Sequence, residues 1–99
     1  MGLLSKLFGP KVDLSEVKRN GAIILDVRTP AEYKSGHGKG SVNIPLDQIK
    51  SKLDKIKAYN KPIITCCASG MRSGSAASIL KSNGVEAYNG GSWGKADRL

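Results

Sequence analysis

The chain has 99 residues and a formal net charge of +8, enough for one domain with a modest core but not for two. Hydrophobic residues make up 39% of it and aromatic residues 5%, so the core must be mainly aliphatic. No stretch reaches membrane-spanning length, and two adjacent cysteines cannot form an ordinary stapling disulfide. We expect a soluble, cytoplasmic protein of a reducing compartment, with an N-terminal extension at residues 1–11 and a single domain at residues 12–99.

Positive charge is the other strong feature of the composition, with 16 basic residues against 8 acidic ones. The basic residues are scattered along the chain and lack the interleaved aromatic side chains of a nucleic-acid surface. Four of them, Lys50, Lys52, Lys55 and Lys57, would form the solvated face of one helix. We therefore expect no nucleic-acid partner, although the surplus charge would attract small anions.

The first half of the chain predicts two short helices around a buried strand. Asp13 is placed to cap the first helix, and Asn20-Gly21 ends it. Residues 22–27, apolar except for Asp26, predict a buried strand. Thr29 and Glu32 then have the spacing of a capping box, which begins the second helix.

The second half predicts further strands and helices in alternation. A glycine-rich loop at residues 36–40 leads to a short strand at residues 42–44. Apolar residues recur at three- and four-residue steps over residues 46–59, which predicts one amphipathic helix. A last short strand is expected at residues 85–88, and the sequence from Gly90 onward has the composition of a tail.

Strands that alternate with helices predict an α/β fold, a small parallel β-sheet flanked by helices on both faces. In such sheets the ligand lies at the carboxyl ends of the strands. Asp26 and Arg28 stand at the end of one predicted strand, and Cys67 stands at the end of another. We therefore expect the functional site at this edge.

The segment from Pro62 to Asn83 predicts a site for a reactive thiol. A β-branched run forms a strand with Cys66 as its last residue, and a helix over residues 73–81 follows, ended by Gly84. The loop between them would wrap its backbone amides around the sulfur of Cys67, at the positive end of the helix dipole. A thiol placed there should be a thiolate near neutral pH.

Three motifs along the chain occur in the order found in a known family. They are LDVRTPAEY at residues 25–33, GHGKGSVNIP at residues 36–45 and CASGMRS at residues 67–73, with YNGGSW at residues 88–93 as a weaker fourth. Together they resemble the rhodanese family of single-domain sulfurtransferases, over most of the chain from residue 22 to residue 93.

The resemblance implies a defined chemistry. The active cysteine attacks the outer sulfur of an anionic donor such as thiosulfate, becomes a persulfide, and passes that sulfur to a thiophilic acceptor such as a thiol or cyanide. Carried over by position, Cys67 is the nucleophile, and Arg72 adds a fixed cation. The amides of the loop would stabilise the thiolate, the persulfide and the donor. These amides belong to Ala68, Ser69, Gly70, Met71, Arg72 and Ser73. No cofactor is required.

Three further residues match the family's supporting positions. Asp26 and Arg28 resemble its strand-end pair, and we expect them to tie neighbouring loops together rather than to act in catalysis. His37 matches its loop histidine, for which we expect a loop-fixing hydrogen bond rather than a role as general base. Two cysteines and one histidine are too few for a zinc site with four ligands, so we expect no metal.

The adjacent cysteines leave a second function open. Cys66 and Arg72 have the C-x5-R spacing of cysteine phosphatases, whereas Cys67 and Arg72 have the C-x4-R spacing of rhodaneses. A wider loop can surround a tetrahedral phosphate, while a tighter loop admits one transferable sulfur. Because Gly70 is correctly placed only when counted from Cys67, we favour sulfur transfer, with Cys66 as a buried core residue or, alternatively, as a thiol that resolves oxidation of Cys67.

A third interpretation is a non-catalytic module, because rhodanese-like domains also occur as binding domains that commonly lack the cysteine. A sulfur carrier would become persulfidated on Cys67 and pass its sulfur to a protein acceptor. We expect a monomer. The apolar residues of the N-terminal extension, Leu3, Leu4, Leu7 and Phe8, could dock on a partner or a membrane surface, but we favour packing against the domain or fraying.

Overall fold

The computed structural model describes residues 12–99, so the N-terminal extension predicted at residues 1–11 lies outside the described part of the chain. The elements in chain order are α2 (Leu14–Arg19), β1 (Ile23–Asp26), α3 (Pro30–Ser35), β2 (Val42–Asn43), the 3-10 helices η1 (Leu46–Gln48) and η2 (Lys50–Lys52), α4 (Leu53–Ala58), β3 (Ile63–Cys67), α5 (Met71–Ser82), β4 (Ala87–Ser92) and α6 (Trp93–Asp97). No helix among these residues is long and apolar enough to cross a membrane.

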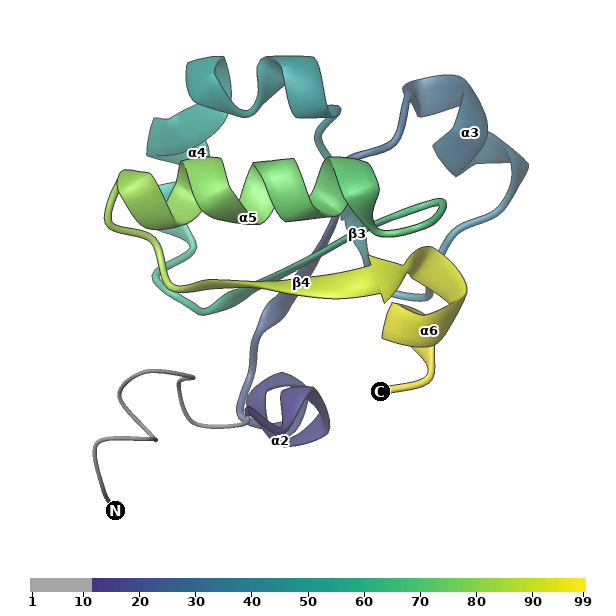
Figure 1. Ribbon diagram of the computed structural model, residues 1–99, viewed down its shortest axis with the longest axis horizontal. Helices are drawn as coiled ribbons and strands as arrows, with labels where there is room; N and C mark the ends of the chain where they lie inside the picture. The colour runs from purple at the N-terminus through teal and green to yellow at the C-terminus, as the bar shows by residue number, and fades with distance from the viewer. Residues whose placement is uncertain (1–11) are drawn as a thin grey trace.

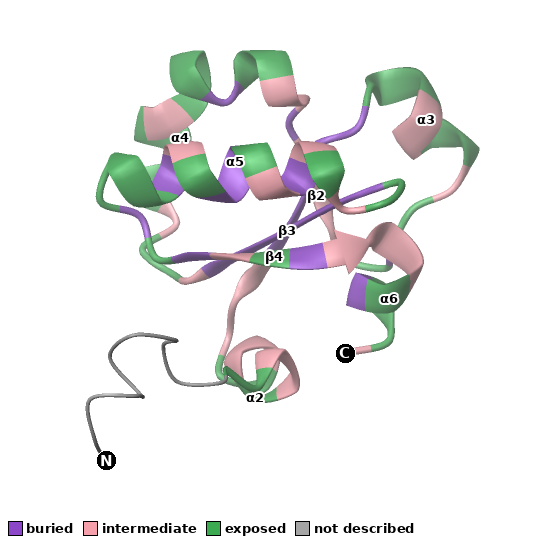
Figure 2. Cartoon of the chain, viewed as in Figure 1, coloured by how far each residue is buried: buried purple, intermediate pink, exposed green. Residues whose placement is uncertain are grey.

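The strands form one parallel sheet in the order β2-β1-β3-β4, which confirms the predicted fold class. Figure 1 shows α4 and α5 over one side of this sheet, the upper face, and α2 and α6 over the other, the lower face. Every residue of β3 is buried. In Figure 2 this strand is purple and lies between helices that carry exposed residues. The last residues of β3, one of the two inner strands, therefore lie in the protein interior.

Alternation along the strands divides the core into two clusters, one for each face. The upper-face cluster includes Leu25, Ile63, Cys67, Ala76, Ala77 and Leu80. The lower-face cluster is formed by Ile24, Ile64, Cys66 and Ala96. Since successive side chains of a strand point to opposite faces, the two cysteines that are adjacent in sequence lie on opposite sides of the sheet.

The helices that border the site begin at strong local signals. Thr29 and Glu32 form the predicted capping box of α3. α5 begins at Met71, two residues before the predicted start at Ser73, because Gly70 has φ 101 and turns the chain directly from the loop into the helix. This early start shortens the connection between β3 and α5.

The single helix predicted over residues 46–59 is wrong, because the segment forms η1, η2 and the short α4. Ile49 donates its N–H to the carbonyl of Leu46, and Lys52 donates to that of Ile49. A 3-10 helix places residues three apart on one side. The three-residue apolar steps that predicted an α-helix therefore fit this tighter winding equally well.

The prediction of a strand at residues 85–88 followed by a tail is also wrong. β4 runs on through both glycines to Ser92, and the following residues form α6. A Cβ on Gly90 would lie 2.7 Å from Cγ2 of Ile64 and 2.8 Å from the carbonyl oxygen of Thr65. Gly90 is thus the residue that lets β4 approach β3 closely, although the sequence from Gly90 onward had suggested a tail.

Candidate active site

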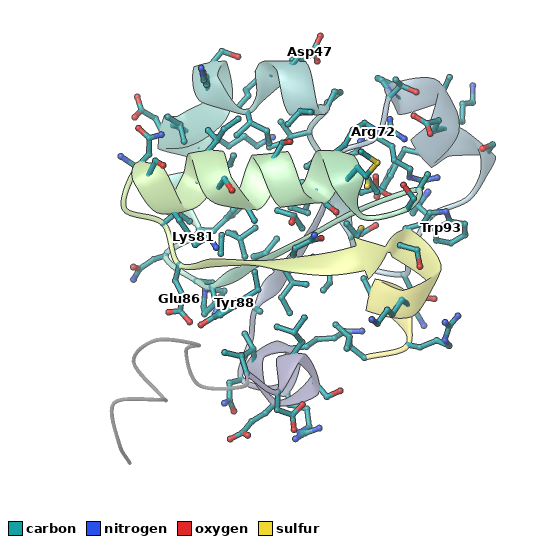
Figure 3. All side chains as sticks on the ribbon, in the orientation of Figure 1. Asp47, Arg72, Lys81, Glu86, Tyr88 and Trp93 are labelled. Carbon is teal, nitrogen blue, oxygen red and sulfur yellow. The ribbon has the colours of Figure 1, made fainter. Side chains whose placement is uncertain are left out.

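The loop between β3 and α5 lies at the carboxyl end of β3 (Figure 1). β3 ends at Cys67, one residue later than predicted. Figure 3 shows Arg72 and Trp93 at this end of the molecule and Tyr88 at the other. The sheet edge at which the sequence predicted a site therefore holds the cysteine loop and the start of α5.

The sulfur of Cys67 accepts hydrogen bonds from the loop that follows it and from the first turn of α5. The N–H of Gly70 donates at 3.0 Å and that of Ser73 at 3.4 Å, and the thiol lies 3.4 Å from the Ser73 hydroxyl. Burial alone raises the pKa of Cys67. Hydrogen bonds from the Ser73 side chain and from the amides of Ser73, Gly70 and Ser69 outweigh it, so the pKa of this thiol lies below its ordinary value. The geometry favours a thiolate.

Asn89 of β4 braces this loop, a role that the sequence did not predict although Asn89 belongs to the YNGGSW motif. Its Nδ2 donates to the carbonyl of Gly70 at 2.9 Å, and its Oδ1 accepts from the Ser73 hydroxyl at 2.6 Å and from the N–H of Gly91 at 3.0 Å. A hydroxyl has one proton. Ser73 therefore accepts from the neutral thiol of Cys67 while it donates to Asn89. For the hydroxyl to donate to the thiolate, its proton has to turn from Asn89 to the sulfur.

Arg72, which was expected to add a fixed cation, is paired with a carboxylate. Its Nη1 and Nη2 donate to the two carboxylate oxygens of Glu32 at 2.7 and 2.9 Å, and each side chain keeps 36% of its surface exposed. The hydrogen bonds from Arg72 lower the pKa of Glu32 to about 2, and those to Glu32 raise the pKa of Arg72. The positive charge beside the loop is thus balanced in the resting structure.

A second ion pair joins Asp26 and Arg28, the residues expected to tie loops together. Arg28 Nη2 lies 2.7 Å from Asp26 Oδ2, and the two side chains are almost fully buried. Arg28 also donates to the carbonyls of Glu32 and Gly36 at 3.3 and 2.7 Å, and its guanidinium lies 4.9 Å from the centre of the Trp93 ring. These contacts fasten α3 and its C-cap residue, Gly36, to the end of β1.

His37 contacts α3 rather than the sulfur loop. Its Nδ1 lies 2.7 Å from the carbonyl oxygen of Tyr33, and its ring stacks on that of Tyr33 with centroids 3.8 Å apart. The Tyr33 hydroxyl donates to the carbonyl of Ser41 at 2.6 Å. This arrangement holds the glycine-rich loop in place. Within residues 12–99, no group of three or more His, Cys, Asp and Glu side chains could hold a metal ion.

Cys66 lies on the lower face, away from the amides of the loop. Burial, followed by the charge of Asp26, raises the pKa of its thiol to about 12. It is therefore a neutral core side chain at physiological pH. The sheet separates it from Cys67, which disfavours a role in resolving oxidation of that residue.

A family model described as the rhodanese-like domain matches residues 12–93. Among curated proteins, the chain is 44% identical to the uncharacterized protein YqhL of Bacillus subtilis, over 69% of this chain and 54% of YqhL. It is 34% identical to the thiosulfate sulfurtransferase PspE of Escherichia coli, over 61% of this chain and 59% of PspE. The chain thus spans a little over half the length of these two relatives.

Solved structures show the same arrangement of elements. A rhodanese with anions from E. coli is 30% identical, with a TM-score of 0.69 over 76% of this chain and 91% of that chain. The human single-domain sulfurtransferase TSTD1 is 27% identical, with a TM-score of 0.65 over 82% of this chain and 88% of that chain. The similarity therefore extends over most of each of these two structures.

Proposed function

Because the chain belongs to the family of rhodanese-like domains, we propose that it is a sulfurtransferase that moves sulfane sulfur through a persulfide on Cys67. The observation that carries this proposal is the convergence of the Gly70 and Ser73 amides on the Cys67 sulfur. Such donors stabilise negative charge on the first sulfur and also on a second sulfur attached to it.

The reaction begins with the Cys67 thiolate and an anionic donor such as thiosulfate. The thiolate attacks the outer sulfur of the donor, the sulfur–sulfur bond of thiosulfate breaks, and sulfite leaves. Cys67 then carries a persulfide anion, and the total charge is the same on both sides of the step. A thiolate or cyanide attacks the terminal sulfur and releases Cys67 as a thiolate. Neither step needs an external oxidant, reductant or cofactor.

The partners proposed for this reaction are a small anionic sulfur donor and a thiol or cyanide-like acceptor, the acceptor being a small molecule or a protein. The name of PspE supports thiosulfate as donor. A monomer in a reducing cytoplasm would keep the Cys67 thiol available. A sulfur carrier that passes its sulfur to a protein would use the same first step and differ only in the acceptor.

The phosphatase alternative requires Cys66 as nucleophile, and the site gives it little support. The thiol of Cys66 has its pKa raised to about 12 and lies with the lower-face core, so it is neither ionised nor surrounded by the loop amides. The experiment is to assay thiocyanate formation from thiosulfate and cyanide beside hydrolysis of an aryl phosphate. We expect thiocyanate formation that Cys67→Ala abolishes. Phosphate release that depends on Cys66 would contradict the proposal.

A further inference from the structure

The Glu32 carboxylate balances the positive charge of Arg72 beside the cysteine loop, and hydrogen bonds from two helices hold it in place. From α5, both of its carboxylate oxygens accept from the guanidinium of Arg72, at 2.7 and 2.9 Å. From its own helix, Oε1 accepts from the N–H and the hydroxyl of Thr29, each at 3.1 Å. Its side chain is fixed and, with a pKa of about 2 set first by the Arg72 hydrogen bonds, ionised at neutral pH.

We propose that Glu32 is a specificity-determining residue that selects sulfur donors by charge. By occupying the guanidinium of Arg72 and adding its own negative charge, it disfavours doubly charged donors such as thiosulfate relative to singly charged thiosulfonates and organic persulfides. This inference rests on the proposed sulfur transfer through Cys67.

The contacts explain why charge is the property selected. The two terminal nitrogens of Arg72 both donate to Glu32, so the end-on fork that would bind two oxygens of thiosulfate is already taken. A dianion must either displace the carboxylate or approach it, and its repulsion from Glu32 is twice that of a monoanion of the same size. Because both side chains are 36% exposed, solvent and salt weaken this discrimination without removing it.

The test compares two donors that share one chemistry and differ in charge, thiosulfate and methanethiosulfonate, with cyanide as acceptor. Glu32→Gln removes the charge but keeps a side chain that serves the capping box with Thr29. We expect kcat/KM for thiosulfate to rise about threefold to tenfold, and that for methanethiosulfonate by less, as expected for one charge removed near a dianion and near a monoanion. The gain should shrink as salt is added.

Three further variants keep the result specific. Glu16→Gln makes the same chemical change on α2, which covers the lower face, and should leave the ratio of the two kcat/KM values unchanged. Adding Arg72→Ala to Glu32→Gln should abolish most of the gain for thiosulfate. Glu32→Ala, which also gives up the capping contact, should change the donor ratio in the same direction as Glu32→Gln, so that an effect on helix stability alone is distinguished.

The outcomes separate this inference from the function on which it rests. An unchanged donor ratio in Glu32→Gln, or a fall in thiosulfate use, would overturn the role of Glu32 while persulfide formation on Cys67 still stood. If neither donor transfers sulfur to Cys67 in the wild-type protein, the proposed function fails and the inference fails with it.

Discussion

The two faces of the sheet contain the same kinds of side chain in opposite states. On the upper side, the Cys67 sulfur accepts backbone N–H groups and its pKa lies below the ordinary value, while the lower-face Cys66 has its pKa raised to about 12 by burial. The Arg72 ion pair is 36% exposed and the Arg28 ion pair almost fully buried. Both thiols are buried, so hydrogen-bond donors distinguish the two cysteines, while solvent access distinguishes the two ion pairs.

The comparison is tested most strongly by the reactivity of the two thiols. In native protein at neutral pH, iodoacetamide should modify Cys66→Ala once, at Cys67, and should leave Cys67→Ala almost unmodified. Both thiols are buried, but only Cys67 has a lowered pKa, whereas Cys66 stays protonated. Mass spectrometry of the two variants gives the result directly. Equal labelling would show that the sheet does not separate the thiols as described.

The two ion pairs should differ in their effect on stability. Arg28→Ala leaves the buried carboxylate of Asp26 without its partner and should lower the free energy of unfolding by about 3–5 kcal/mol. Arg72→Ala removes a solvent-exposed pair and should change stability little. Urea unfolding of both variants measures the difference. Equal decreases in the free energy of unfolding would remove the distinction between the structural and the functional arginine.

Close packing of β4 on the lower face should make Gly90 intolerant of a side chain. Gly90→Ala places a methyl group against Ile64 and the Thr65 carbonyl and should cost about 1–3 kcal/mol, the usual range for overpacking. Gly94→Ala, in α6, meets its nearest neighbour at 3.5 Å and should be neutral or slightly stabilising. Similar melting temperatures for the two variants would contradict the observed register of β4.

The smallest expected effect is on the pH at which Cys67 ionises. Ser73→Ala removes the side-chain hydrogen bond that lowers the pKa of Cys67. The rise in alkylation rate with pH should therefore move to higher pH than in the protein with Ser73. Both proteins carry Cys66→Ala, so that Cys67 is the thiol followed. The lowered pKa also stabilises the fold above about pH 8.5, the usual thiol value, and this contribution is lost as pH falls through the folded pKa. An alkylation profile that stays in place would exclude Ser73 as a stabiliser of the thiolate.

Much of the active loop could be predicted from the sequence because its determinants are local. The strand, the cysteine, Gly70 and the start of α5 follow one another directly, so the amide cradle follows from their order. β3 ends one residue later than predicted. α5 begins two residues earlier than predicted, because Gly70 turns the chain directly into the helix.

The residues that were missed act across long stretches of chain. Asn89 reaches Ser73 over 16 residues, and Glu32 reaches Arg72 over 40 residues. Glu32 could be assigned from sequence only to its capping box, which is local. Its second role needs α3 and α5 to be packed together. The role of Asn89 needs β4 to continue through two glycines that lie beyond the predicted end of the strand at residue 88.

The central claim is that Cys67 carries transferable sulfur, and intact mass spectrometry tests it most directly. After incubation with thiosulfate, the wild-type protein and Cys66→Ala should each gain the mass of one sulfur atom, and cyanide should remove it. Cys67→Ala should gain nothing. A gain that persists in Cys67→Ala, or no gain in the wild-type protein with either thiosulfate or methanethiosulfonate, would contradict the account.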